Sequence, residues 1–302
     1  MKPFRYLCLQ AGVLVVCAGP AHAVLVDGVL DPVYGAPLAT QTTQTSFGDW
    51  PASPDFYGEL DGAFGYVASD TLHLFVSGNV SRFRSEPLVL PNQLQLYLDT
   101  QSGGQNPMSS ANPSVGGYVN LQGIAGLGFD PEFAPDYWLA GSCDQFARFY
   151  AFYAELPAGG GGAGYFLGSS TVGGPGALSG GTSNPHGILA AVDLSNTAGV
   201  PAGCDAGSGA GVGTGAEWAI PLAALGNPTG PIRVCALLAR ASGPGASLVS
   251  NQLLGPVPPG TCSLGPADTV DLASVPGTQY FVIDRASPTI RSSWGRIKTL
   301  FR

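Results

Sequence analysis

The stretch QLQLYLD, residues 93–99, alternates apolar and polar side chains at every second position. Leu94, Leu96 and Leu98 share one face of an extended chain, while the glutamines and Tyr97 share the other face. A repeat of two residues is typical of a half-buried β-strand, because successive side chains point to opposite faces of a sheet. The stretch therefore predicts a strand whose leucine face packs against a core.

Similar strand signals recur along the chain, separated by turn residues. The 45 glycines and 26 prolines accompany a hydrophobic content of 45%, which favours many short strands joined by turns. No segment between residues 24 and 284 has the pattern of a helix of three turns, so we expect one antiparallel, jelly-roll-like β-sandwich over 24–284. The other predicted strands are LHLFVSG (72–78), RFYAFYAEL (148–156), GYFLGSS (164–170), GILAAVDL (187–194), EWAIPL (217–222), IRVCALLA (232–239) and QYFVID (279–284).

Residues 1–23 have the features of a cleaved secretory signal. Lys2 and Arg5 precede a short apolar segment that ends in Ala-His-Ala at residues 21–23. A lipoprotein would be processed at Cys17, but Val16 stands where a small residue is expected. The mature chain is therefore expected to begin at residue 24 and to be secreted to the periplasm, the cell surface or the medium.

Charge divides the mature chain into an acidic body and a basic tail. Residues 24–284 contain 20 acidic and five basic residues, a net charge of −15, which argues against a nucleic-acid partner. Residues 285–302 contain five basic residues and no acidic one. Apolar and basic side chains alternate there with helical spacing, which predicts an amphipathic helix at an anionic membrane surface. The alternative is a tail that packs on the sandwich or stays disordered. The residues of the predicted helix are Ile290, Arg291, Trp294, Arg296, Ile297, Lys298 and Phe301.

Four cysteines remain after the signal is removed, and an even number in an oxidising compartment predicts two disulfides. Four cysteines allow three pairings. The favoured pairing joins Cys143 to Cys204 and Cys235 to Cys262, because the second bond closes the shorter loop. Free buried thiols are the alternative, and the absence of a C-x-x-C spacing disfavours a metal site.

The order of these elements resembles a group of uncharacterised secreted bacterial β-sandwich proteins, many of which carry a PEP-CTERM sorting tail. The opening DGVLD at residues 27–31 and EWAIPLAALG at 217–226 are also similar to family 9 carbohydrate-binding modules and DOMON-like sandwiches. The resemblance implies a sandwich fold and a sugar ligand clamped by tryptophans. It also implies a bound calcium ion or, in DOMON-like proteins, haem held by Met and His. The PEP-CTERM tail itself is missing from this chain.

The candidate ligand-binding residues are aromatic side chains next to carboxylates. Trp138 and Tyr137 follow Asp136 after a proline-bounded acidic loop, and Trp50 is a second candidate. Aromatic rings can stack on the C–H faces of sugars, while carboxylates accept their hydroxyl hydrogens. Trp218, which alternates with apolar residues, is expected in the core.

Clustered acidic residues suggest calcium, which prefers oxygen ligands. The candidate groups are Asp27 with Asp31, Asp99 with Gln101 and Asn106, and Asp130 with Glu132 and Asp136. The alternative for Asp27 and Asp31 is turn formation, in which the carboxylate accepts a hydrogen bond from the backbone two residues later. No group has the EF-hand spacing.

The predicted function is non-catalytic binding of glycans or of extracellular matrix at the cell surface, with a polysaccharide as partner. A hydrolase that uses Asp130 and Asp136, and a purely structural surface protein, are the alternatives. No G-x-S-x-G or H-E-x-x-H motif favours catalysis. Haem held by Met108 and either His73 or His186 is disfavoured, because Met108 lies in a polar stretch.

Overall fold

The computed structural model describes residues 24–41, 58–82, 92–196, 211–243, 246–255, 257–258 and 260–285. The predicted signal peptide, Trp50, Cys204 and the helix expected after residue 285 lie outside these ranges. No helix within them is long and apolar enough to span a membrane.

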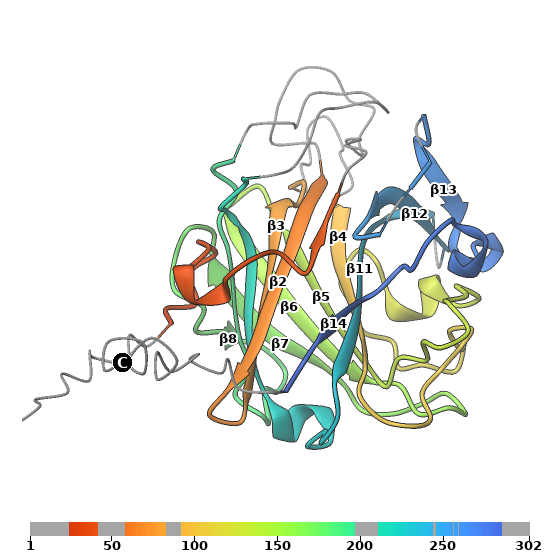
Figure 1. The fold of residues 1–302 in the computed structure, drawn as a ribbon, viewed down its shortest axis with the longest axis horizontal. Coiled ribbons are helices and arrows are strands. Elements are labelled where there is room, and N and C mark those ends of the chain that lie inside the picture. Colours follow the sequence, from red (N-terminus) through yellow and green to blue (C-terminus); the bar gives the residue numbers. More distant parts are fainter. Residues whose placement is uncertain are drawn as a thin grey trace, which may run out of the picture.

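The described residues form two antiparallel β-sheets joined by turns and short 3-10 helices (Figure 1). The strands are β1 (Ala39–Thr40), β2 (Glu59–Ala68), β3 (Thr71–Asn79), β4 (Asn92–Asp99), β5 (Tyr137–Cys143), β6 (Arg148–Glu155), β7 (Gly164–Thr171), β8 (Ser179–Gly180), β9 (Leu189–Val192), β10 (Gly215–Pro221), β11 (Ile232–Gly243), β12 (Ala246–Leu253), β13 (Ser263–Pro266) and β14 (Phe281–Ile283). The 3-10 helices are η1 (Pro32–Tyr34), η3 (Leu121–Ile124), η4 (Leu222–Leu225), η5 (Ala267–Thr269) and η6 (Leu272–Ser274).

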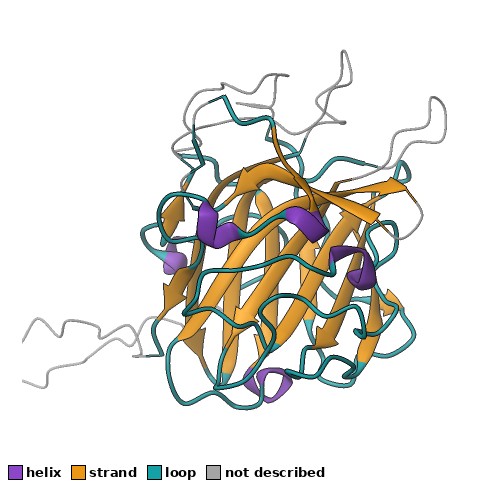
Figure 2. Cartoon of the chain, turned by 90° about the vertical axis from the view of Figure 1, so that its right-hand side faces the viewer, coloured by secondary structure: helices purple, strands orange, loops and turns teal. Residues whose placement is uncertain are grey.

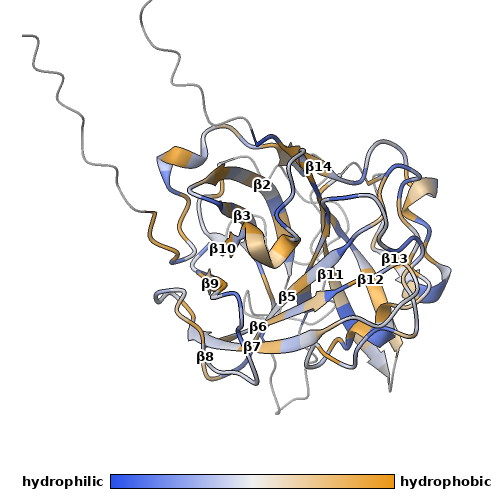
Figure 3. Ribbon diagram, turned by 90° about the horizontal axis from the view of Figure 1, so that it is seen from below, coloured by the Kyte–Doolittle hydropathy of each residue, from blue (hydrophilic) through white to orange (hydrophobic). Residues whose placement is uncertain are grey.

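The two sheets lie face to face as the layers of a sandwich (Figure 3). The five-stranded sheet has the order β1-β2-β3-β10-β9. The nine-stranded sheet has the order β13-β12-β11-β4-β5-β6-β7-β8, and β14 also pairs with β11. This arrangement confirms the predicted all-β antiparallel sandwich. Each of the eight segments predicted to be extended contains a strand.

The core between the sheets is built from the apolar faces that the sequence predicted. Leu94, Leu96 and Leu98 on β4 are fully buried there with Leu72 and Leu74 of the opposite sheet. Trp218 on β10 is fully buried, and its indole packs edge-on against Phe149 of β6 with ring centroids 5.8 Å apart. The prediction that this tryptophan, Trp218, belongs to the core is therefore confirmed.

The second face of β4 is also buried, so the prediction of a half-buried strand is wrong for β4. Gln93, Gln95 and Tyr97 are all 0% exposed. Two chain segments that we call the loop layer, residues 105–135 and the described residues of 257–280 outside β13, cover this face of the nine-stranded sheet (Figure 2). The loop layer contains η3, η5 and η6, and its apolar side chains form a second core with the sheet.

The N-terminal segment covers the outer face of the five-stranded sheet and is held there by a buried carboxylate. Glu217 on β10 accepts hydrogen bonds from the backbone N–H of Asp27 (2.9 Å) and Gly28 (3.0 Å) and from the hydroxyl of Tyr34 (2.9 Å). Burial raises the pKa of Glu217, and the two backbone hydrogen bonds oppose this rise. The turns at residues 27–35 thus dock the N-terminal segment onto the five-stranded sheet.

The predicted disulfide pairing is wrong. Cys143 on β5 and Cys235 on β11 are free thiols, each 1% exposed. They face opposite sides of the nine-stranded sheet, since Cys143 lies in the inter-sheet core and Cys235 lies under the loop layer. Cys262 is disulfide-bonded. No disulfide joins two residues within the described ranges, so the partner of Cys262 lies outside them.

We expect the folded protein to resist thiol reagents and the denatured protein to react with two equivalents without a reductant. Burial raises the pKa of Cys143 to about 12 and also raises that of Cys235, so neither thiolate forms near neutral pH. Colorimetric thiol titration of protein that begins at residue 24, with and without guanidinium, tests this. In guanidinium, the Cys143→Ala variant should show one equivalent of reactive thiol. A denatured wild-type protein with no reactive thiol would contradict the assignment.

Glu59, the first residue of β2, is a fully buried carboxylic acid. No described residue forms a hydrogen bond with either of its oxygens. Burial, together with the nearby charge of Asp61, raises the pKa of Glu59 to about 8 from an ordinary value of 4.5. The protonated form therefore dominates at neutral pH, and the sandwich avoids burying a second negative charge beside Asp61.

Because the folded-state pKa of Glu59 exceeds the unfolded-state value, its contribution to stability is complete below pH 4.5 and is lost as the pH rises through about 8. The isosteric Glu59→Gln substitution removes this dependence. We expect the free energy of unfolding of the variant, relative to wild type, to rise by on the order of 3 kcal/mol between pH 5 and pH 9. Urea denaturation at both pH values measures it. Exposed Glu132→Gln is the control, and a pH-independent difference for Glu59→Gln would contradict the prediction.

Candidate functional site

An open groove of about 800 Å³ lies at the hairpin between β5 and β6, on the face of the nine-stranded sheet that the loop layer partly covers. Strand side chains form its floor, a loop-layer segment forms one wall, and the hairpin forms the other. The described residues that line it are Gly117, Tyr118, Ser142, Asp144, Phe146, Arg148, Tyr150 and Phe152.

Aromatic side chains dominate the groove, and two of them are strongly exposed. Phe146 at the hairpin tip is 74% exposed, and Tyr118 on the opposite wall is 45% exposed. Tyr150 and Phe152 lie on one face of β6, and their rings lie 6.1 Å and 5.3 Å from the ring of Phe166 on β7. The rings form a continuous apolar shelf on the sheet that ends at these exposed side chains.

Asp144 fixes the shape of the hairpin wall. One carboxylate oxygen accepts hydrogen bonds from the backbone N–H of Phe146 (2.8 Å) and of Arg148 (2.9 Å). The other oxygen accepts a hydrogen bond from the hydroxyl of Tyr150 at 2.7 Å. Burial and this hydrogen bond raise the pKa of Tyr150, so its hydroxyl stays protonated and donates. A side chain that is only 8% exposed thus organises three residues of the groove.

A chain of buried hydrogen bonds fixes the loop-layer wall. The indole N–H of Trp138 donates to Oε1 of Gln95 at 2.6 Å, and the Gln95 amide donates to Gln93 at 2.7 Å. The Gln93 amide in turn donates to the backbone carbonyl of Gly116 at 2.9 Å. Gly117 follows with a φ of +57°, and a Cβ there would lie 3.1 Å from the ring of Phe152. Tyr118 is therefore presented beside the aromatic shelf.

The structure places the predicted ligand residue Trp138 in the second core rather than on the surface, so the prediction that it stacks on a ligand is wrong. Its side chain is 0% exposed and lies under the loop layer. Asp136 and Tyr137 are also buried, at 6% and 8% exposed, and line a different hollow of about 430 Å³. That hollow lies at the opposite end of β5 from the groove. The fourth predicted residue, Trp50, lies outside the described residues.

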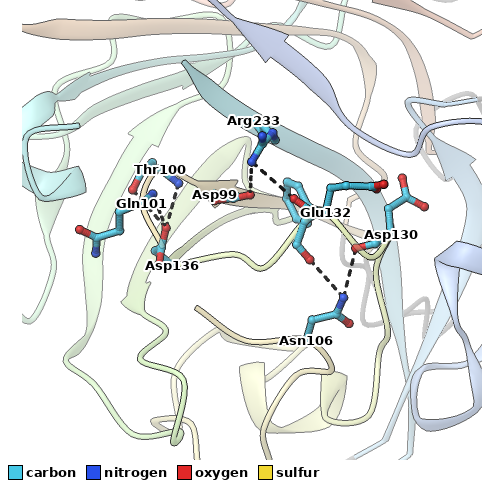
Figure 4. A network of polar contacts seen from close by, with 9 residues as sticks. Asp99, Thr100, Gln101, Asn106, Asp130, Glu132, Asp136 and Arg233 are labelled. Carbon is cyan, nitrogen blue, oxygen red and sulfur yellow. Dashed lines mark hydrogen bonds and ion pairs between the residues drawn. The ribbon is translucent and has the colours of Figure 1, made fainter. Parts of the chain in front are cut away.

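The carboxylate of Asp136 is engaged by backbone donors (Figure 4). One oxygen accepts hydrogen bonds from the N–H of Thr100 (2.8 Å) and of Gln101 (3.0 Å) and from the Thr100 hydroxyl (3.3 Å). Burial raises the pKa of Asp136, and these hydrogen bonds oppose the rise. Asp130, its proposed catalytic partner, accepts a hydrogen bond from the backbone N–H of Gln279 at 2.8 Å. Both carboxylates therefore hold loops in place.

The residues proposed as calcium ligands make other contacts (Figure 4). Asp99 forms an ion pair with Arg233 at 3.0 Å, and the same guanidinium lies near the backbone carbonyl of Glu132. The side-chain amide of Asn106 donates to the carbonyls of residues 129, 130 and 133 and accepts from the N–H of residue 129. No three His, Cys, Asp or Glu side chains in the described part of the chain are placed to hold a metal ion.

Turn formation, the alternative to calcium binding, is observed for one of the two N-terminal aspartates. Asp27 accepts a hydrogen bond from the N–H of Val29 at 2.9 Å, which is the turn that the sequence suggested. The side chain of Asp31 makes no such bond, and its backbone carbonyl accepts from Tyr34 instead. The DGVLD opening thus serves to dock the N-terminal segment.

The structure does not bring together the proposed haem ligands. Met108 is buried in the second core, under the loop layer. His186 packs near Tyr153, which faces the inter-sheet core on the other side of the same sheet. His73 stacks on Tyr66 on the five-stranded sheet, with ring centroids 4.8 Å apart.

Sequence reasoning missed the groove residues, although the strand that carries them was predicted. In RFYAFYAEL, aromatic residues occupy both faces of the strand. Phe149 and Tyr153 fill the inter-sheet core, so Tyr150 and Phe152 must face the other side. A phenylalanine just before this predicted strand, Phe146, was the second available signal.

Neither a family model, nor a curated protein, nor a solved structure matches the chain. A functional conclusion therefore rests on the chemistry and geometry of the groove.

Replacing the carboxylate that shapes the hairpin should destabilise the groove. Asp144→Ala leaves two backbone N–H groups and a tyrosine hydroxyl without their acceptor, which should lower the free energy of unfolding by about 2–4 kcal/mol. Hydrogen exchange at residues 145–150 should accelerate in parallel. Asp193→Ala, which removes one local hydrogen bond to Ser195, is the matched control. An equal loss of unfolding free energy in both variants would show that Asp144 does not hold the hairpin in place.

Proposed function

We propose that this protein is a secreted, non-catalytic glycan-binding protein and that the groove between Tyr118 and Phe146 is its sugar-binding site. The observation that carries the proposal is the exposed aromatic pair beside a fixed shelf of rings. The signal at residues 1–23 supports secretion on sequence grounds.

The exposure of these rings supports ligand binding, because an exposed phenylalanine costs solubility and contributes little to folding. Phe146 is the most exposed large apolar side chain in the described part of the chain. Sugars present C–H faces that pack against aromatic rings, while their hydroxyls need a few fixed polar partners. Ser142, Arg148 and the hydroxyls of Tyr118 and Tyr150 supply such partners along the groove.

The size and openness of the site favour a polymer over a small metabolite. The groove has a volume of about 800 Å³ and lies on one face of the nine-stranded sheet, which gives room for several sugar units. Its walls are fixed before a ligand arrives, by Asp144 on one side and by the Gln93 hydrogen bond on the other. A preformed site reduces the entropy lost on binding.

Removing either exposed ring should weaken glycan retention without unfolding the protein. We expect Phe146→Ala and Tyr118→Ala each to weaken binding by about tenfold, because each loses a stacking contact worth about 1–1.5 kcal/mol. The measurement is a glycan array followed by affinity electrophoresis against the polysaccharides that bind.

Val33→Ala provides a matched control, because Val33 is 52% exposed but lies on η1, on the outer face of the other sheet. Its binding should equal that of wild type. Wild-type protein that binds no polysaccharide on a broad array, or ring variants that bind as wild type does, would overturn the proposal.

A further inference from the structure

The groove contains one cation and one anion, and only the cation is available to a ligand. Both oxygens of Asp144 already accept hydrogen bonds from the protein. Arg148 is exposed at the start of β6, and none of its guanidinium nitrogens is engaged by a described residue. The ion pair found among the described residues does not involve Arg148, because it joins Arg233 to Asp99.

The backbone of Arg148 is held by Asp144 at both of its polar groups. Its backbone N–H donates to the carboxylate of Asp144, and its carbonyl accepts from the N–H of Asp144 at 3.0 Å. The positive charge of Arg148 acts on the hydroxyl of Tyr150, whose pKa it lowers against the larger effect of burial. The guanidinium therefore lies at the polar edge of the aromatic shelf.

An arginine side chain without an acidic partner is unusual in residues 24–284, where acidic residues greatly outnumber basic ones. Residues 24–284 carry 20 acidic residues and only five basic ones, so most of the surface repels polyanions. A guanidinium carries two parallel N–H groups that match the two oxygens of a carboxylate. An arginine left unpaired among rings is suited to bind a carboxylate carried by a stacked sugar.

We propose that the groove selects acidic glycans, whose sugar rings stack on the aromatic shelf while a uronate carboxylate pairs with Arg148. This inference rests on the proposed glycan-binding function and specifies its ligand class. The acidic body outside the groove makes the pairing selective, because a polyanion gains attraction only where its carboxylate reaches Arg148.

The test compares polygalacturonate with the neutral polymer made by reducing its carboxyl groups, so that the backbone stays the same. Wild-type protein should bind the acidic polymer at least tenfold more tightly, because only that polymer can form charge-assisted hydrogen bonds with Arg148. In Arg148→Gln this ratio should fall to about one. Arg148→Lys should retain part of the preference, because lysine keeps the charge but loses the paired N–H groups.

Arg285→Gln is the charge-matched control, since Arg285 follows β14 at the other end of the strands from the groove. Its ratio should equal that of wild type. Equal binding of both polymers by wild type would overturn the acidic selectivity and leave glycan binding intact, whereas binding of neither polymer nor any other glycan would overturn both. Tighter binding to dextran sulfate than to polygalacturonate would overturn the carboxylate assignment.

Discussion

The hydrogen-bond chain from Trp138 through Gln95 and Gln93 to Gly116 is the constraint on which the rest of the structure depends. Each of these groups lies under the loop layer, where water does not supply a partner, so each must be satisfied within the protein. The chain crosses from β5 to β4 and ends on the loop layer. These hydrogen bonds therefore attach the loop layer to the sheet and fix the position at which the loop layer ends.

The groove exists because the loop layer stops before the edge of the nine-stranded sheet. Under the layer, the outer face of β4, β5 and β11 forms a second core. Beyond it, the same face continues over β6 and β7 as a shelf of rings with partial access to solvent. A surface at such a border has a rigid floor and rigid walls, which is the condition that the proposed glycan binding requires.

Buried carboxylates have an architectural role throughout this acidic chain. Glu217 docks the N-terminal segment, Asp144 shapes the hairpin, and Asp136 and Asp130 hold loops at the far end. Each accepts backbone N–H groups, which compensates part of the cost of removing a charge from water. The acidic clusters that suggested metal ligands or catalytic pairs are explained by these contacts.

The sequence by itself predicted eight of the fourteen described strands and the sandwich fold, because alternation with a period of two and frequent turn residues act locally. The leucine face of QLQLYLD and the burial of Trp218 followed from that alternation. Only the tertiary structure decided that the glutamine face is buried too, because a segment distant in the chain covers it. It also decided that Cys143 and Cys235 are buried as free thiols in two different cores, so neither forms the disulfide predicted for it. The groove depends on the same long-range effect, since Tyr118, Phe146 and Arg148 meet only when the loop layer and the β5–β6 hairpin pack on one face.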